Sequence, residues 1–322
     1  MRITTHILLG WLLLVMPAAA WNGLGHRTVA TLAWRQMNDA QRRAATELLK
    51  HHPHYKVILT VNVPDGVDQG EWAYLTAAVW PDLIKPAKAG QPAKPHSITR
   101  YNVYPHGINL PFVHSADAGR VSLADFVVPE PNAATGLSNS IVTLKDTTAT
   151  PHDRAVSLAW VLHLMGDLHQ PLHAATLVTP KQPKGTGLGG ACTVRNERGK
   201  PINLHTYWDR LPGTNAGYAD IMALADSVAN APELAPSRLP EYRLNQTPAA
   251  WARESFDHAV QFAYAEDHVK FVDTKAVESG SIRRSAIPTL SPEYVREAHE
   301  IMRRRIALAG QRLADVLTQV AW

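Results

Sequence analysis

Two histidine-aspartate pairs and a further histidine stand at spacings that suit a metal centre. His163 and Asp167 are four residues apart, His205 and Asp209 repeat that spacing, and His173 follows six residues after Asp167. Residues four apart share one face of a helix, so each pair presents an imidazole and a carboxylate together. A single pair is most simply interpreted as a hydrogen bond in the core. The repetition, together with His173, favours a metal.

Zinc is the metal that these side chains suit, because imidazole and carboxylate ligands are typical of zinc sites. Three protein ligands that leave one position open form a catalytic centre, whereas four ligands close a structural one. His173, His205 and Asp209 supply one set of three. The remaining pair, His163 and Asp167, needs ligands from other parts of the chain.

A buried helix is expected to carry this remaining pair. Thr150 can cap it, and Pro151 suits a first helical position. Residues 155–165 are apolar around the whole circumference, which is typical of a buried helix. A carboxylate at the end of such a helix is costly unless it is paired or bound to metal. Pro171 should bend or end the helix before His173 is reached.

Upstream candidates for the missing ligands are Asp82 and His106. His96 competes with His106 for the role of histidine ligand, since both stand in the same stretch of the chain. Lys85 follows three residues after Asp82. From spacing alone, Lys85 is best interpreted as a solvated loop lysine.

Five motifs that hold these residues resemble those of the zinc-dependent single-strand nucleases of the S1/P1 type. In chain order they are WNGLGH, AVWPDLIK, HGINLPF, HLMGDLHQPLH and NLHTYWD. Members of that family are mostly helical, carry three zinc ions and share their fold with zinc-dependent phospholipases C. The resemblance implies an all-α, mainly helical single domain over residues 21–322, with a small β-hairpin or extended loop near residues 183–203.

The resemblance also implies a ligand set for each of three Zn²⁺ ions. The proposed ligands are Asp82, His106, His163 and Asp167 for the first ion; the amine and carbonyl of Trp21, with His26 and a shared Asp167, for the second; and His173, His205 and Asp209 for the third. Asp82, Lys85 and Asp167 are then the predicted catalytic residues. The two ions that share Asp167 would activate a bridging water as hydroxide, and Lys85 would neutralise charge in the transition state.

The first twenty residues predict a signal peptide. Arg2 precedes a short apolar run over residues 7–15, and three alanines over residues 18–20 form a small-residue cleavage site. Cleavage leaves Trp21 with a free α-amine, which titrates near about 7.7 to 8.0 and can therefore bind a metal near neutral pH. The mature protein is expected to be exported, periplasmic or secreted, without stable membrane insertion. Its only cysteine, Cys192, excludes an internal disulfide.

The basic composition, with a net charge of +4 and a pI of about 9.1, favours a polyanionic partner only weakly. The strongest basic cluster, residues 303–305, falls on a helix expected to begin at Ser291-Pro292, and we expect its arginines to be solvated. The histidines at positions 51, 52 and 54 follow an amphipathic stretch and are expected to cap it or face solvent.

Three positions depart from the family pattern near the base-binding pocket. Gly107, Asn109 and Ala191 stand where many members have an aromatic, an acidic and an asparagine residue. An aromatic platform contributes about 1 to 3 kcal/mol per stacked base, so base recognition is in doubt. Side chains that could replace the platform are Tyr101, Tyr104 and Phe112.

The sequence therefore predicts a monomeric zinc-dependent endonuclease. Its substrates would be single-stranded DNA and RNA, or nucleotides from which it releases the 3′-phosphate. Two alternatives remain open at this point, a zinc-dependent phospholipase C and a zinc-binding secreted protein without catalysis.

Overall fold

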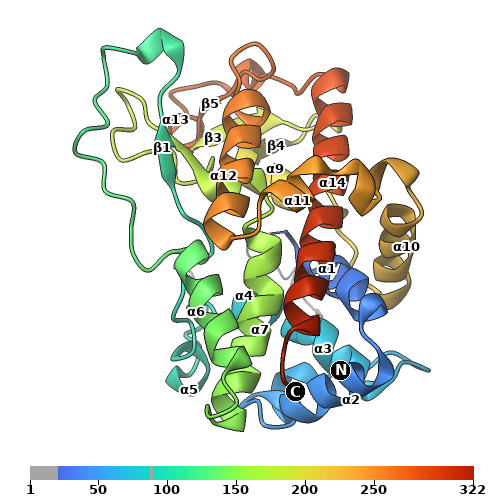
Figure 1. The fold of residues 1–322 in the computed structure, drawn as a ribbon. Helices are drawn as coiled ribbons and strands as arrows, with labels where there is room; N and C mark the ends of the chain where they lie inside the picture. The colour runs from blue at the N-terminus through green and yellow to red at the C-terminus, as the bar shows by residue number, and fades with distance from the viewer. Residues whose placement is uncertain (1–20, 88–89) are drawn as a thin grey trace, which may run out of the picture.

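The structure is a computed structural model that describes residues 21–87 and 90–322; the predicted signal peptide lies outside the described residues. Helices dominate it (Figure 1). The α-helices are α1 Gly23–Gln36, α2 Asp39–Leu49, α3 Gln69–Ala77, α4 Trp80–Leu83, α5 His96–Thr99, α6 Ala133–Lys145, α7 Pro151–Asp167, α8 Pro171–Ala174, α9 Leu204–Asp209, α10 Tyr218–Ala229, α11 Pro240–Leu244, α12 Pro248–His258, α13 Thr274–Glu278 and α14 Pro292–Thr318. The π-helical turns are η1 Tyr55–Leu59 and η5 Ala259–Ala263, and the 3₁₀ turns are η2 Ser115–Asp117, η3 Pro232–Leu234, η4 Pro236–Arg238 and η6 Arg284–Ala286.

Short strands form two small sheets. In the first, β1 Leu110–Phe112 pairs in parallel with β2 Ala175–Leu177. In the second, β3 Cys192–Arg195 lies between the antiparallel strands β4 Pro201–Asn203 and β5 Val272–Asp273. The hairpin of β3 and β4 falls within residues 183–203, so the prediction of a mainly helical fold with a small β-element there is confirmed.

The buried helix α7 begins and ends as its sequence predicts. The Thr150 side chain accepts a hydrogen bond from the Asp153 amide, and Pro151 is the first helical residue. Twelve of its seventeen residues are buried, because α7 packs against α6, α1 and α14. In Figure 1 the C-terminal helix α14 runs beside α1 and α7 through the middle of the molecule. The helix ends at Asp167, four residues ahead of Pro171.

The expected start of α14 is confirmed, with Ser291 as its cap and Pro292 as its first residue. The expectation of solvated arginines is wrong for Arg305, which is fully buried. Burial is tolerated because Arg305 forms an ion pair with Glu254 on α12. Helical periodicity alone could not reveal a buried partner on another helix.

Two of the three histidines after α2 are also buried, against expectation. His52 and His54 pack on the Trp80 ring, and the Trp80 indole N–H donates to His54 Nδ1 at 2.9 Å. Only His51 is exposed.

None of the described helices combines the length and apolar character that crossing a membrane requires.

Candidate metal centre

The structure brings eight of the predicted site residues together at the C-terminal end of α7. His26 comes from α1, Asp82 from α4, His106 from the loop before β1, and the others from α7, α8 and α9. They form three groups, and within each group the potential ligand atoms lie within 4.8 Å of one another. The first group is His26, His163 and Asp167, and the second is Asp82, His106 and the same His163. The third group is His173, His205 and Asp209. We call these eight candidate ligands the metal-ligand cluster.

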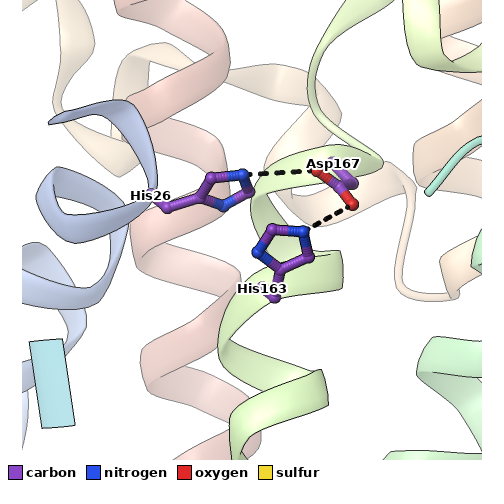
Figure 2. Close-up of side chains that lie close together, drawn as sticks. All are labelled: His26, His163 and Asp167. Carbon is purple, nitrogen blue, oxygen red and sulfur yellow. Dashed lines mark ion pairs between the residues drawn. The ribbon is translucent and has the colours of Figure 1, made fainter. Parts of the chain in front are cut away.

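Asp167 stands where two of the groups meet. Figure 2 shows its carboxylate facing both the His26 ring from α1 and the His163 ring from its own helix. Its Oδ1 lies 3.4 Å from His26 Nε2. Its Oδ2 lies 3.2 Å from His163 Nε2 and 3.0 Å from His106 Nδ1. The two oxygens of one carboxylate thus face different imidazoles, as a bridging ligand requires.

Asp82 completes the second group and carries a lysine beside it. Its Oδ1 lies 3.6 Å from His106 Nδ1, 3.7 Å from His163 Nε2 and 2.7 Å from Lys85 Nζ. Burial alone would raise the pKa of the Asp82 carboxyl, but Lys85 and the imidazoles outweigh burial and hold that pKa at about 2. Lys85 is about one quarter exposed and is paired at the site, so it is not a solvated loop lysine.

The third group is built on α8 and α9. His173 Nε2 lies 3.5 Å from Asp209 Oδ1, and His205 Nε2 lies 3.3 Å from Asp209 Oδ2. The fully buried Gln170 donates a hydrogen bond to Asp209 Oδ1 at 2.8 Å. Sequence reasoning missed Gln170, whose only signal is an amide one residue before the proline that opens α8.

In three of the imidazoles, one ring nitrogen is held by a backbone carbonyl. His163 Nδ1 lies 2.8 Å from the Ala78 oxygen, and His205 Nδ1 lies 3.0 Å from the Leu188 oxygen. His173 Nδ1 lies 2.5 Å from the His106 oxygen. A neutral imidazole that donates to a carbonyl presents a lone pair at its other nitrogen, which is the arrangement typical of metal-ligating histidines.

Many acceptor atoms of the cluster lack a protein donor, although Asp209 Oδ1 accepts from Gln170. Both carboxylate oxygens of Asp82 and Asp167 receive no aligned hydrogen bond from any described residue; Lys85 approaches Asp82 only as an ion pair. Both ring nitrogens of His26 and Nε2 of His173 are likewise buried and unpartnered. Each buried group without a partner costs about 1 to 3 kcal/mol. Converging acceptors of this kind fit bound cations, and the donor set suits zinc.

Close packing brings Trp21 to the same end of α7. Trp21 is fully buried, and the next amide, that of Asn22, donates to the Asp209 carbonyl at 2.9 Å. A Cβ added at Gly25 would lie 2.7 Å from Trp21 Cβ, and one added at Gly166 would lie 2.7 Å from His26 Nδ1. Only glycine at these two positions lets the N-terminal segment approach the cluster so closely.

The competing histidines lie elsewhere. His96 is exposed at the start of α5 and belongs to none of the three groups, whereas His106 lies inside one. His169 is buried, but its Nε2 accepts a hydrogen bond from Arg312 rather than facing the cluster. These positions agree with the preference for His106 and with a structural role for His169.

Packing gives a steric reason for one of the departures from the family pattern near the expected base pocket, the glycine at position 107. A Cβ at Gly107 would lie 2.8 Å from the His173 carbonyl oxygen and 2.7 Å from Leu188 Cδ1, so the present backbone leaves no room for an aromatic residue at position 107. Phe112 is nearly buried and packs against the Tyr264 ring, which removes it as a stacking platform. Tyr104 packs edge-to-face on Trp160.

Fold and cluster together define a class of protein. A mainly helical domain whose helix ends gather carboxylates and imidazoles into adjoining metal-ligand groups is suited to metal-dependent hydrolysis of phosphate esters. The chain belongs to the S1/P1 nuclease family, because the model of that family matches residues 21–321. It is therefore a phosphodiester hydrolase of the nuclease type.

Curated relatives support this assignment at low identity. The chain is 25% identical to Endonuclease 5 of Arabidopsis thaliana over 321 residues, which covers 95% of this chain and 92% of the relative. It is 22% identical to Nuclease S1 of Aspergillus oryzae over 312 residues, covering 94% of this chain and 92% of the relative. Endonuclease 4 of Arabidopsis thaliana is 29% identical over 185 residues, or 54% of this chain and 53% of that protein.

Proposed function

We propose that the protein is a zinc-dependent nuclease that hydrolyses phosphodiester bonds in single-stranded DNA and RNA, with release of 3′-phosphate from nucleotides as a second activity. The observation that carries the proposal is the convergence of buried, unpartnered carboxylate and imidazole lone pairs at the end of α7. Membership of the S1/P1 family and the endonuclease relatives supply the class of substrate.

Three zinc ions would be held by the residues of the cluster. The ligand sets are Asp82, His106, His163 and Asp167; Trp21, His26 and Asp167; and His173, His205 and Asp209. The support for a shared Asp167 is that its Oδ1 faces His26 of the first group, whereas its Oδ2 faces His106 of the second.

Bound zinc would supply Lewis acidity to the phosphoryl oxygens and lower the pKa of an attacking water. The protein's own residues supply position and charge. The carbonyls behind His163, His173 and His205 hold these rings so that one nitrogen faces the cluster. Lys85, at the partly exposed edge beside Asp82, brings a positive charge to where phosphate charge develops.

Export completes the centre in this proposal. Removal of residues 1–20 would leave the α-amine of the buried Trp21 close to His26, and the family match begins at the same residue. A protein with one extra residue ahead of Trp21 has an amide in place of this amine. It should fold, retain two zinc ions by elemental analysis and lose most activity. Full activity of the extended protein would remove Trp21 from the ligand set.

The function is tested by giving purified mature protein single-stranded DNA, RNA, a 3′-nucleotide and phosphatidylcholine, each with and without chelator. Cleavage of the nucleic acids that chelator abolishes and added zinc restores is the expected result. Cleavage of lipid alone would establish the phospholipase C alternative. Three bound zinc ions with no cleavage of any substrate would establish the non-catalytic alternative.

A further inference from the structure

A cavity of about 300 Å³ lies against helices α1 and α4, which also carry two residues of the metal-ligand cluster. Two of its lining residues directly follow cluster residues: Arg27 follows His26 on α1, and Leu83 follows Asp82 on α4. Successive residues of an α-helix point about 100° apart, as 3.6 residues per turn requires. The cavity therefore opens on the neighbouring face of the same two helices.

The Arg27 guanidinium in this cavity lacks an anionic partner. Its Cζ lies 4.8 Å from the centroid of the Trp72 ring, and Nη1 donates to the Ala216 carbonyl at 3.4 Å. The buried Nε has no acceptor, and no carboxylate of the described residues lies within ion-pair distance of Arg27. Burial lowers the pKa of Arg27 to about 10, with no acidic neighbour to offset it. The fully buried Arg305, by contrast, pairs with Glu254.

The rest of the cavity combines one more unpartnered polar group with an apolar rim. Thr76 is buried, and its hydroxyl has no hydrogen-bond partner among the described residues. Val57, Val61 and Leu83 are exposed to 66%, 42% and 38% and line the same cavity, so they form one apolar patch. The Arg27 guanidinium, the Thr76 hydroxyl and the exposed apolar side chains together suit a ligand that is an anion with an apolar group attached.

We propose that this cavity is a subsite for the nucleotide that flanks the cleaved bond, with its phosphodiester on Arg27 and Thr76 and its base against Val57 and Leu83. The proposal rests on the nuclease function proposed above. Charge complementarity supports it, because a guanidinium binds phosphate oxygens through two parallel N–H groups. The position of the cavity also supports the proposal, because a nucleic-acid strand bound at Asp82 must continue over an adjacent face of the protein.

The test compares thymidine dinucleotide, which has one phosphodiester, with a longer oligothymidylate, using the zinc-loaded protein. The quantity measured is the ratio of kcat/KM for the long substrate to that for the dinucleotide. Arg27→Met keeps the apolar stem over Trp72 and removes the charge; it should lower this ratio about tenfold, the effect of one lost charge-assisted contact. Arg27→Lys should restore part of the ratio. The matched control is Arg35→Met, because Arg35 lies on the same helix and already pairs with Asp226 at 2.8 Å.

Salt dependence gives a second readout. Loss of one phosphate contact should reduce the slope of log KM against log salt for the long substrate by about 0.7. An equal loss of kcat/KM on both substrates would show a structural role for Arg27 and overturn the proposal, as would an unchanged ratio. Binding of phosphatidylglycerol vesicles that Arg27→Met abolishes, with the ratio unchanged, would overturn it in favour of a lipid. If the wild-type protein cleaves neither substrate, the nuclease function itself fails.

Discussion

Two buried polar clusters flank the turn between Asp167 and His173, and they differ in whether their groups find partners. One is the metal-ligand cluster. The other, the arginine cluster, consists of Arg305 and Arg312 from α14, Glu254 and Ser255 from α12, and His169 from the turn itself. Most residues of each cluster are buried, and each has a partly exposed edge at His106 and His205 or at Glu254, so burial does not distinguish them.

In the arginine cluster nearly every donor meets an acceptor. Arg312 Nη2 donates to Glu254 Oε1 at 2.7 Å, and Arg305 Nη2 donates to Ser255 Oγ at 2.9 Å. Ser255 donates in turn to the Leu168 carbonyl at 2.5 Å, and Arg305 Nε reaches the His169 carbonyl at 3.2 Å. Within the cluster only Arg312 Nε lacks a partner.

The metal-ligand cluster shows the reverse pattern, with few aligned donors for its carboxylates. His163 Nε2 lies 2.7 Å from His106 Nδ1, and the carboxylates beside them receive no aligned donor from the described chain. The comparison teaches that a buried charged group marks a structural site when its partners are protein groups. It marks a ligand site when the partners are missing and the lone pairs converge.

The largest expected effect comes from Asp167→Asn, which removes the carboxylate that faces both His26 of the first group and His106 of the second. Zinc content should fall from three ions to one, and activity should fall about 10⁴-fold, which corresponds to about 5.4 kcal/mol in the barrier. In the presence of chelator, the variant should be at least as stable as the wild type, because the substitution removes a buried charge without an aligned donor. Elemental analysis, kinetics and denaturant unfolding measure the three quantities.

The matched control for this variant is Asp153→Asn in the first turn of the same helix, where the aspartate is exposed. It should keep all three ions and wild-type activity. Retention of three zinc ions by Asp167→Asn would contradict the shared role of Asp167.

Glu254→Gln should produce the opposite result in the arginine cluster. Removing one partner leaves Arg305 and Arg312 as buried, uncompensated charges, so the free energy of unfolding should fall by about 3 kcal/mol with or without chelator. Zinc content should stay at three ions. Asp257→Asn, on the same helix, is the control, since its ion pair with Arg253 is exposed and contributes less than about 1 kcal/mol. Equal destabilisation by the two substitutions would show that the arginine cluster is not stabilising.

Spacing made two pairs of the metal-ligand cluster predictable, whereas His26, Asp82 and His106 are distant in sequence and were indicated by the resemblance to the family. His163 and Asp167 are one helical turn apart, and so are His205 and Asp209, so their spacing carries information about shared faces. The arginine cluster was not predictable, because Arg305 and its acid partner Glu254 are fifty-one residues apart on different helices. Gln170 and Arg27 were missed for the same reason. Their importance depends on contacts across the fold, which periodicity does not encode.

Gly166→Ala tests how closely the metal-ligand cluster is packed. The added methyl group would lie 2.7 Å from His26 Nδ1, so the imidazole must move. Zinc binding at the His26 group should weaken about 10- to 100-fold, and the free energy of unfolding should fall by about 1 to 3 kcal/mol. Gly136→Ala is sterically matched, because its methyl group would lie 2.8 Å from Tyr104 Cγ, away from the cluster. It should destabilise the protein while leaving zinc affinity unchanged, and equal zinc affinities in the two variants would exclude a steric role for Gly166.

The smallest expected effect is a pH dependence confined to the arginine cluster. Burial alone would raise the pKa of Glu254, but hydrogen bonds and charges from Arg312 and Arg305 outweigh it and lower that pKa below its ordinary value of 4.5. A carboxyl whose pKa is depressed by folding stabilises the protein above its unfolded pKa, and this contribution is lost as the pH falls through the folded pKa. The stability difference between wild type and Glu254→Gln, measured by urea unfolding in chelator, should therefore be constant above about pH 5 and shrink as the pH falls through the folded pKa of Glu254. Burial and the charges of Arg305 and Arg312 lower the pKa of His169, but His169 is present in both proteins, so its contribution cancels to first order in this difference. A difference that does not vary with pH would show that the arginines leave the pKa of Glu254 unchanged, and the contrast between a satisfied and an unsatisfied cluster would then lose its electrostatic basis.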